Sequence, residues 1–314
     1  MRIKRSKSPV APRAKKAEIL PGISDTRLIA AYAAAQPWLR RPNVTGIGIG
    51  FVWEKGRPTE KIGLCVHVTS RIADEKLTER QRFPRTLLGV RVDVIKSNPK
   101  AHLSPEELDE RRRIASIPIR PGTLIKSPAG ELGTIALLVM SRSSATPYVL
   151  GSGHVMLVAG NQFFQPNPTA KDALGLTVER VERALGDAAI ASYSGRSINN
   201  RPVGFNKRIT SIRPVQLGDE LSMSGAFSGV TKGVVDSVGM KYFPYDDGGI
   251  NVPGFNIRPK IAGTMLSVNG DSGALWYDAS GAGVGINVGG EGGAEPWAFA
   301  SHLVDMMSLL DVEI

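Results

Sequence analysis

Short apolar segments separated by glycine-rich turns fill the second half of this sequence. This pattern is compatible with only a few folds. They recur at residues 133–140, 147–150, 188–191, 220–224, 231–238, 275–277 and 283–288. Short runs of this kind with turn residues between them are typical of β-strands, and 35 glycines and 21 prolines are available for the turns. The pattern predicts a mainly β sandwich or pair of barrels over residues 121–314. Apolar residues at helical spacing from Trp297 to Leu310 predict a closing helix.

The residues before this β region divide into three further parts. Residues 24–98 predict a small α+β unit, with a helix from Ser24 or Asp25 to Trp38 and strands at 44–52, 62–68 and 90–95. Residues 99–120 predict a linker, in which Ser104-Pro105-Glu106-Glu107 has the form of a capping box for a short helix. Residues 1–23 predict a basic, disordered arm.

The net charge of +10 is concentrated in that arm. Seven Lys and Arg residues lie within residues 1–16 with no acidic residue among them, which leaves the body close to neutral. A solvated arm and an arm that contacts a polyanion are both compatible with this distribution. Cys65 is the only cysteine, so no disulfide can form within the chain. The apolar run at residues 28–35 is too short to span a bilayer, so we expect a soluble, cytoplasmic protein with no membrane partner.

Ser272 is the candidate nucleophile of this sequence. It stands in Gly270-Asp271-Ser272-Gly273, directly before an apolar segment. Flanking glycines allow the backbone unusual dihedral angles and a close approach to a substrate. The same residues are also ordinary β-turn chemistry. A serine hydroxyl is weakly nucleophilic, so the catalytic interpretation needs a base and a group that orients the base.

His154 and Asp187 are the candidates for those two roles. His154 follows a strand in Gly151-Ser152-Gly153-His154, and Asp187 begins the apolar segment 187–191. Singly, His154 would more often be a structural histidine, and Asp187 would be a turn cap. Together they precede Ser272 in the order His, Asp, Ser, with intervals of 33 and 85 residues, which leaves room for the strands of two barrels.

These motifs resemble those of the trypsin-like serine peptidases. Gly270-Asp271-Ser272-Gly273 matches the nucleophile motif of that family, with Ala274 where a further glycine is usual. The resemblance implies two six-stranded antiparallel β-barrels of the chymotrypsin type and acyl transfer with no cofactor. It implies that His154 is the general base, that Asp187 orients it, and that the backbone N–H groups of Gly270 and Ser272 form the oxyanion hole. The partner would be a protein or peptide substrate.

A closer resemblance is to the trypsin-like proteins related to plant NARROW LEAF 1 and their bacterial relatives. It rests on the order of Gly133-Thr134, Tyr148-Val149-Leu150, Gln165-Pro166 and Asp187-Ala188-Ala189, and on a Gly46-Ile47-Gly48 strand in the N-terminal unit. The sequence departs from this pattern at residues 224–231, which puts a shared choice of substrate in doubt.

By the same family resemblance, four residues line the substrate site. Leu266 would lie near the floor of the primary side-chain pocket, and Val288, Gly289 and Gly290 would form its wall and pair with substrate backbone. An apolar Leu266 offers no carboxylate, so we expect a preference for small or apolar residues. The alternative for 288–293 is a plain glycine-rich hairpin.

Other functions compete with the peptidase hypothesis. A catalytically silent interaction module with the same fold would bind a protein partner, and a latent peptidase would need an activator or regulatory protein. Cys65 and His67, two residues apart on one predicted strand, predict either a dyad or an ordinary half-buried strand. The four histidines, at positions 67, 102, 154 and 302, lack metal-ligand spacing, so no metal site is expected. Gly46-x-Gly48-x-Gly50 lacks the helix-opening context of a phosphate-binding loop.

Overall fold

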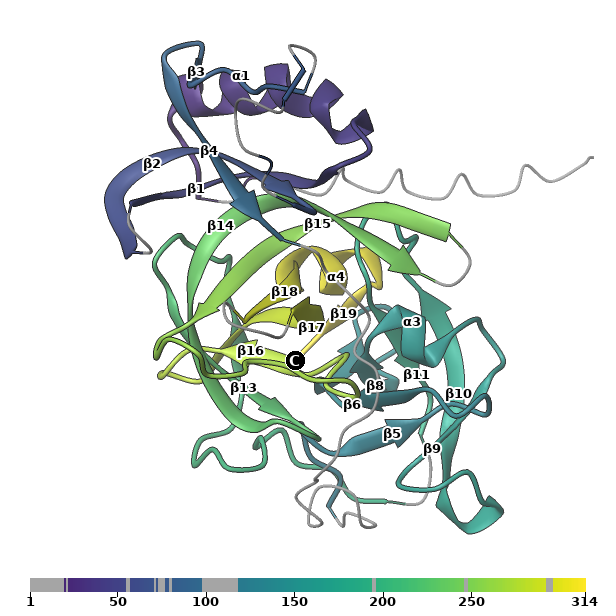
Figure 1. The fold of residues 1–314 in the computed structure, drawn as a ribbon. Helices are drawn as coiled ribbons and strands as arrows, with labels where there is room; N and C mark the ends of the chain where they lie inside the picture. Colours follow the sequence, from purple (N-terminus) through teal and green to yellow (C-terminus); the bar gives the residue numbers. More distant parts are fainter. Residues whose placement is uncertain are drawn as a thin grey trace, which may run out of the picture.

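The fold of this chain consists of an N-terminal unit and two rings of β-strands (Figure 1). A computed structural model describes residues 20, 22–54, 57–70, 72, 77–78, 81–97, 118–193, 196–245, 248–291 and 296–314. The predicted linker helix at 104–113 and nearly all of the predicted arm lie outside these residues. None of the helices within them is both long enough and apolar enough to cross a membrane.

The N-terminal unit packs one helix on a small sheet, as the sequence predicts. Helix α1 (Thr26–Ala35) is capped by Asp25, whose side chain accepts a hydrogen bond from the N–H of Arg27 at 2.8 Å. A 3₁₀ turn, η1 (Gln36–Arg40), follows it. The strands are β1 (Val44–Glu54), β2 (Arg57–Val68), β3 (Thr86–Leu87) and β4 (Val90–Lys96). The buried face of α1 joins one apolar cluster with β1 and β2.

The N-terminal unit is not a separate body, because its sheet continues into the second ring. Strand β1 pairs with β14, with Gly46 opposite Lys241 and Gly50 opposite Ser237. A Cβ atom at Gly46, Gly48 or Gly50 would lie 2.5–2.8 Å from a carbonyl oxygen of β14. The glycine repeat of β1 is therefore required for close packing against the ring, and Figure 1 shows β14 and β15 between the N-terminal unit and the remaining strands.

The first ring contains six antiparallel strands, one of which is bent into two segments. Its strands are β5 (Leu124–Lys126), β6 (Leu132–Thr134), β7 (Leu137–Ser141), β8 (Pro147–Gly151), β9 (Gln162–Phe164), β10 (Ala173–Arg180) and β11 (Ala189–Ala191). The predicted strand 133–140 is β6 and β7, divided at Ile135 and Ala136. The N–H of Ile135 donates to the carbonyl of Thr123, just before β5, at 3.0 Å. The N–H of the next residue, Ala136, donates to the carbonyl of Leu150 on β8 at 2.9 Å. This bend closes the ring, since β6 and β7 stand near its two ends. Between β9 and β10 lies a 3₁₀ turn, η3 (Ala170–Asp172).

The second ring also contains six antiparallel strands and is closed by the pairing of β13 with β14. Its strands are β13 (Glu220–Gly225), β14 (Gly229–Tyr245), β15 (Gly248–Pro259), β16 (Leu275–Tyr277), β17 (Ala282–Glu291) and β18 (Trp297–His302). The short strand β12 (Ser211–Ile212) adds to β17. The fold is mainly β, with two rings of antiparallel strands after a small N-terminal unit, as predicted.

The end of the chain corrects one prediction. Residues 297–302 form strand β18, and helix α4 covers only Leu303–Leu309 before strand β19 (Val312–Glu313). All six residues of β18 are buried between β15 and β17. A continuous buried run gives no alternation from which a strand could be told from a helix. Helix α4 packs on the apolar cluster shared by both rings, which includes Leu150, Ile190, Leu275 and Ile286.

Candidate active site

His154 lies where strand β8 turns into the one-turn helix α3 (Gly153–Met156). Gly151 ends the strand, and Ser152 has extended backbone angles before the helical turn begins. The His154 side chain is 22% exposed. It is therefore anchored by a buried strand while part of its ring still meets solvent.

Asp187 lies directly beside His154 because β11 pairs with β8, with Ala189 opposite Gly151. The Asp187 side chain is 1% exposed. Its Oδ1 accepts the backbone N–H of His154 at 2.9 Å, and its Oδ2 is hydrogen-bonded to Nδ1 of the ring. A Cβ atom at Gly153 would lie 2.9 Å from Oδ1. The turn before His154 thus has to be small for the carboxylate to reach the histidine.

Two serines, which the sequence analysis did not single out, hold Asp187. The hydroxyl of Ser152 donates to Oδ2 at 3.0 Å and lies 2.7 Å from Nδ1 of His154. The backbone N–H of Asp187 donates to the hydroxyl of Ser301, on β18, at 3.1 Å. Burial by itself would raise the pKa of Asp187. The charge of His154 and the hydrogen bonds from His154 and Ser152 outweigh that effect and hold this pKa below its usual value.

Ser272 stands in a tight turn between Val268 and Ala274. Gly270 and Gly273 both have left-handed backbone angles, with φ of +90° and +93°. Inside the turn, Asp271 N–H donates to Val268 O at 3.1 Å, and Gly273 N–H donates out of the turn to Asn287 O on β17 at 2.8 Å. The Ser272 hydroxyl is partly exposed and donates to the carbonyl of Val288 at 3.3 Å.

The turn that carries Ser272 packs against the turn that carries His154. A Cβ atom at Gly273 would lie 2.9 Å from the backbone nitrogen of Ser152 and 2.4 Å from the carbonyl oxygen of Thr134. Ser272 thus comes from the second ring, and His154 and Asp187 come from the first. The two turns, distant in sequence, pack together where the two rings join.

The two predicted oxyanion donors are available for a ligand. Within the described part of the chain, the backbone N–H groups of Gly270 and Ser272 donate to no protein acceptor. The N–H groups of Asp271 and Gly273, which alternate with them, are both occupied. This alternation leaves two donors on the same short turn as the Ser272 hydroxyl.

The carboxylate of Asp271 fixes the turn from within. It is fully buried, its Oδ2 accepts Val268 N–H at 2.9 Å, and its Oδ1 accepts the N–H groups of Phe227 and Ser228 at 2.9 and 3.2 Å. Burial raises the pKa of this carboxyl above its usual value, against the effect of these hydrogen bonds. Residues 224–231, where the sequence departs from the pattern that it otherwise resembles, thus include the β13–β14 turn that caps Asp271.

The predicted substrate residues lie in two different settings. Leu266 is 1% exposed and packs in the core of the second ring. Val288 is also buried, and its carbonyl faces Ser272. Gly289 and Gly290 pair with β18 on one side of β17, while on the other side the ladder with β16 stops at Ile286.

Other candidate groups lie apart from this site. Cys65 and His67 are both buried in β2, where the Cys65 thiol faces Phe51 O at 3.9 Å and the His67 ring lies 3.5 Å from the Asn256 amide. Burial raises the pKa of Cys65 well above its usual value. Among the described side chains, no three or more His, Cys, Asp or Glu are grouped to hold a metal ion.

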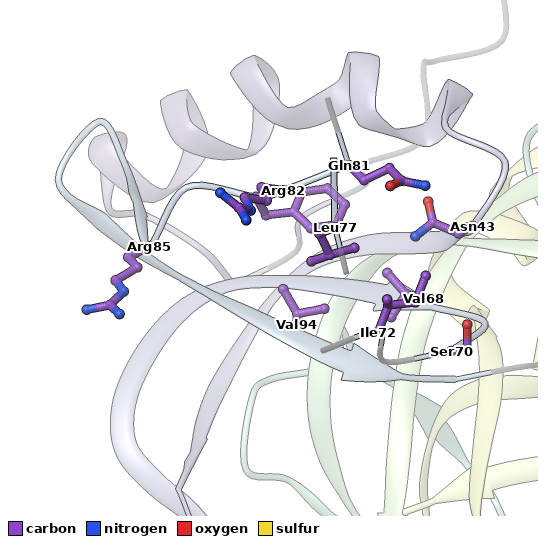
Figure 2. Close-up of a pocket in the computed structure, with 10 residues that line it drawn as sticks. Asn43, Val68, Ser70, Ile72, Leu77, Gln81, Arg82, Arg85 and Val94 are labelled. Carbon is purple, nitrogen blue, oxygen red and sulfur yellow. The ribbon is translucent and has the colours of Figure 1, made fainter. Parts of the chain in front are cut away.

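A cavity of about 750 Å³ lies within the N-terminal unit. Figure 2 shows its side chains between helix α1 and the strands below, among them Asn43, Val68, Arg82 and Val94. A second cavity of about 550 Å³ lies where that unit meets the second ring, and Trp53 and Arg258 are among its lining residues. None of the residues lining either cavity is a predicted site residue.

Comparisons with known proteins give fold neighbours and no family assignment. No family model matches the sequence, and no curated protein matches it. Solved structures that resemble it are serine proteases of the chymotrypsin fold. A Nocardiopsis protease is 16% identical over 62% of this chain and 97% of its own, with a TM-score of 0.48. A glutamic acid-specific serine protease is 22% identical over 62% and 98%, with a TM-score of 0.49. A Cellulomonas bogoriensis chymotrypsin is 16% identical over 63% and 98%, also with a TM-score of 0.49. Likeness at this level assigns no activity to this chain.

Proposed function

We propose that this protein is a serine endopeptidase that hydrolyses peptide bonds through His154, Asp187 and Ser272. The observation that carries the proposal is the pairing of a buried Asp187 with the His154 ring beside a serine turn that has two unused N–H donors. A base, a group that orients it, a nucleophile and an oxyanion site are the parts that acyl transfer requires.

The reaction proceeds in two halves. Ser272 Oγ attacks the carbonyl carbon of the substrate while His154 takes the hydroxyl proton, and the N–H groups of Gly270 and Ser272 receive the developing oxyanion. His154 then gives the proton to the leaving amine as the C–N bond breaks. Water attacks the resulting ester by the same route and releases the acid. Asp187 holds the imidazole tautomer and stabilises its charged form.

The free edge of β17 supports the predicted mode of substrate binding. Beyond Asn287, the side of β17 away from β18 has no partner strand among the described residues. An extended substrate would therefore pair with the backbone of Val288, Gly289 and Gly290. Leu266 is apolar and offers no carboxylate, which favours small or apolar residues at the cleaved position, and strict cleavage after arginine in a peptide library would contradict this preference.

A latent resting state is favoured by one contact. The Ser272 hydroxyl donates to Val288 O at 3.3 Å, so its proton has to turn away from that carbonyl, by rotation about the Cβ–Oγ bond, before it can pass to His154. Substrate backbone that pairs with β17, or a regulatory protein partner, would release the Ser272 hydroxyl from the Val288 carbonyl. The same contact is compatible with the alternative function, a catalytically silent module that binds a protein.

Labelling with a fluorophosphonate probe tests the proposal. Wild-type protein should be labelled, Ser272→Ala should not, and Ser143→Ala, at an exposed serine, should be labelled like wild type. Folding of each variant is checked by circular dichroism. Folded wild-type protein that takes up no label, both alone and with peptide substrate present, would support the silent module.

A further inference from the structure

One residue of the first ring holds the serine turn of the second. Thr134, the last residue of β6, is fully buried. Its backbone N–H donates to Ser272 O at 2.8 Å, and its hydroxyl donates to Gly270 O at 2.7 Å. The turn is therefore held at the carbonyls of both residues whose N–H groups are the proposed oxyanion donors.

The hydroxyl of Thr134 is itself fixed in direction. While its hydrogen points to Gly270, its oxygen accepts the N–H of Ala226 at 3.1 Å. Ala226 belongs to the same β13–β14 turn whose next two N–H groups cap Asp271. Among the described residues, the hydroxyl has one acceptor and one donor as partners, which together fix its direction.

These contacts fix the peptide planes around the Ser272 N–H. A carbonyl and the N–H of the following residue share one rigid plane. Thr134 holds the plane between residues 270 and 271 and the plane between 272 and 273, which bracket the plane that carries the Ser272 N–H. Gly270 and Gly273 place no side chain at the two ends of the turn, so the contacts of Thr134 act together with those of Asp271 to set its orientation.

We propose that Thr134 is the positioning residue of the oxyanion hole, and that docking of the first ring on the second is what aligns the hole. This inference rests on the proposed function, because it gives the two N–H groups their role. Thr134 touches neither substrate nor the reacting atoms.

Paired substitutions separate the hydrogen bonds of Thr134 from its packing. Thr134→Val keeps the shape and removes the hydroxyl, and Thr134→Ser keeps the hydroxyl and removes a methyl group. Thr45→Val is the matched control, because the buried Thr45 hydroxyl also donates to a carbonyl, that of Ser97 at 2.7 Å, away from the site. If Thr134→Val does not fold, Thr134→Cys replaces it, since a thiol is a weak donor.

Two readouts are expected to agree. The rate constant for fluorophosphonate labelling should fall about 10- to 100-fold in Thr134→Val and stay within about threefold of wild type in Thr134→Ser and Thr45→Val. The ¹⁵N amide resonances of Gly270 and Ser272 should shift in Thr134→Val and stay in place in the other two variants. Equal losses in the Val and Ser variants would overturn the inference, because packing would then explain them.

The amide readout separates this inference from the proposed function. If wild-type protein is not labelled, the peptidase proposal fails, and the resonances of Gly270 and Ser272 still decide whether Thr134 sets the turn. If wild type is labelled and Thr134→Val reacts at the same rate with unshifted resonances, the inference on Thr134 fails and the peptidase proposal stands.

Discussion

The Ser152 hydroxyl donates a hydrogen bond to Oδ2 of Asp187 at 3.0 Å, inside a site where both side chains are almost fully buried. The same hydroxyl lies 2.7 Å from Nδ1 of His154. Ser152 is thus a third member of the contact between the base and its orienting carboxylate, and it comes from the strand end that carries the histidine.

Ser152→Ala is expected to weaken the His154–Asp187 contact. A hydrogen bond to a buried charged group contributes about 1.5–3 kcal/mol, so the labelling rate should fall about tenfold or more, since each 1.4 kcal/mol corresponds to a factor of ten. The low-field proton resonance of the His154 Nδ1–Asp187 hydrogen bond should shift as well. Ser301→Ala is the control, because Ser301 contacts the Asp187 N–H and leaves the carboxylate untouched. An unchanged resonance in Ser152→Ala would contradict the prediction.

Gly273→Ala is expected to destroy activity through geometry alone. The residue has φ of +93°, and the added Cβ would lie 2.4 Å from Thr134 O. Because backbone atoms on both sides have to move, the free energy of unfolding should fall by about 2 kcal/mol or more. Denaturant unfolding and probe labelling measure the two effects. Gly160→Ala is the control: its φ is +88°, and nothing lies within 4 Å of the added Cβ. A Gly273→Ala protein with wild-type stability would contradict the described turn.

Stability is expected to fall as the pH is lowered from about 6.5 toward 4. Burial lowers the pKa of His302 from 6.5 to about 4, so in this range the unfolded chain binds a proton that the folded chain does not. The contribution of His302 to the free energy of unfolding is fully present above pH 6.5 and amounts to at most about 3 kcal/mol. Burial lowers the pKa of His67 well below its usual value too, and it adds in the same direction.

Replacing His302 separates the two histidines. In His302→Leu, the slope of unfolding free energy against pH between 6.5 and 4 should become shallower without vanishing, because His67 remains. Urea unfolding at several pH values measures it. An unchanged slope would mean that His302 is accessible to protons in the folded state.

Lys241→Met is expected to leave the protein as stable as the wild type at pH 7, or more so. The Lys241 side chain is fully buried, with its Nζ 2.7 Å from Ser97 Oγ and 3.4 Å from the centre of the Trp297 ring. Burial lowers its pKa well below the usual value, and an apolar side chain of similar length avoids that desolvation. Lys241→Glu should be strongly destabilising. Thermal unfolding compares the three proteins, and a large loss in Lys241→Met would show that the amine is required.

Deletion of residues 1–16 tests the predicted polyanion contact. These residues contain seven Lys and Arg, so if the arm binds nucleic acid, retention on DNA should weaken and its salt dependence should become less steep. Peptidase labelling should not change. Equal retention with and without the arm would remove it as a binding element.

Local chemistry let the sequence predict most of the strands and single out the candidate site residues. Asp25 caps α1 because its side chain reaches the next turn without help from the fold. His154, Asp187 and Ser272 could be picked out because each stands in a small-residue turn at a strand end. Strand β18 was mistaken for a helix because its continuous burial comes from β15 and β17, which no local pattern displays.

The sequence by itself determined a mainly β chain, with its reactive residue types in the order His, Asp, Ser. Only the tertiary structure decided how they are positioned, since the contact of Ser152 with Asp187 needs β8 to pair with β11, and the contacts of Thr134 need the two rings to pack together. The glycines of β1 also show one property that the sequence displays and one that only the tertiary structure explains. Their spacing is plain in the sequence, but its reason, carbonyl groups of β14 within 2.8 Å of any added Cβ atom, exists only once distant strands are paired.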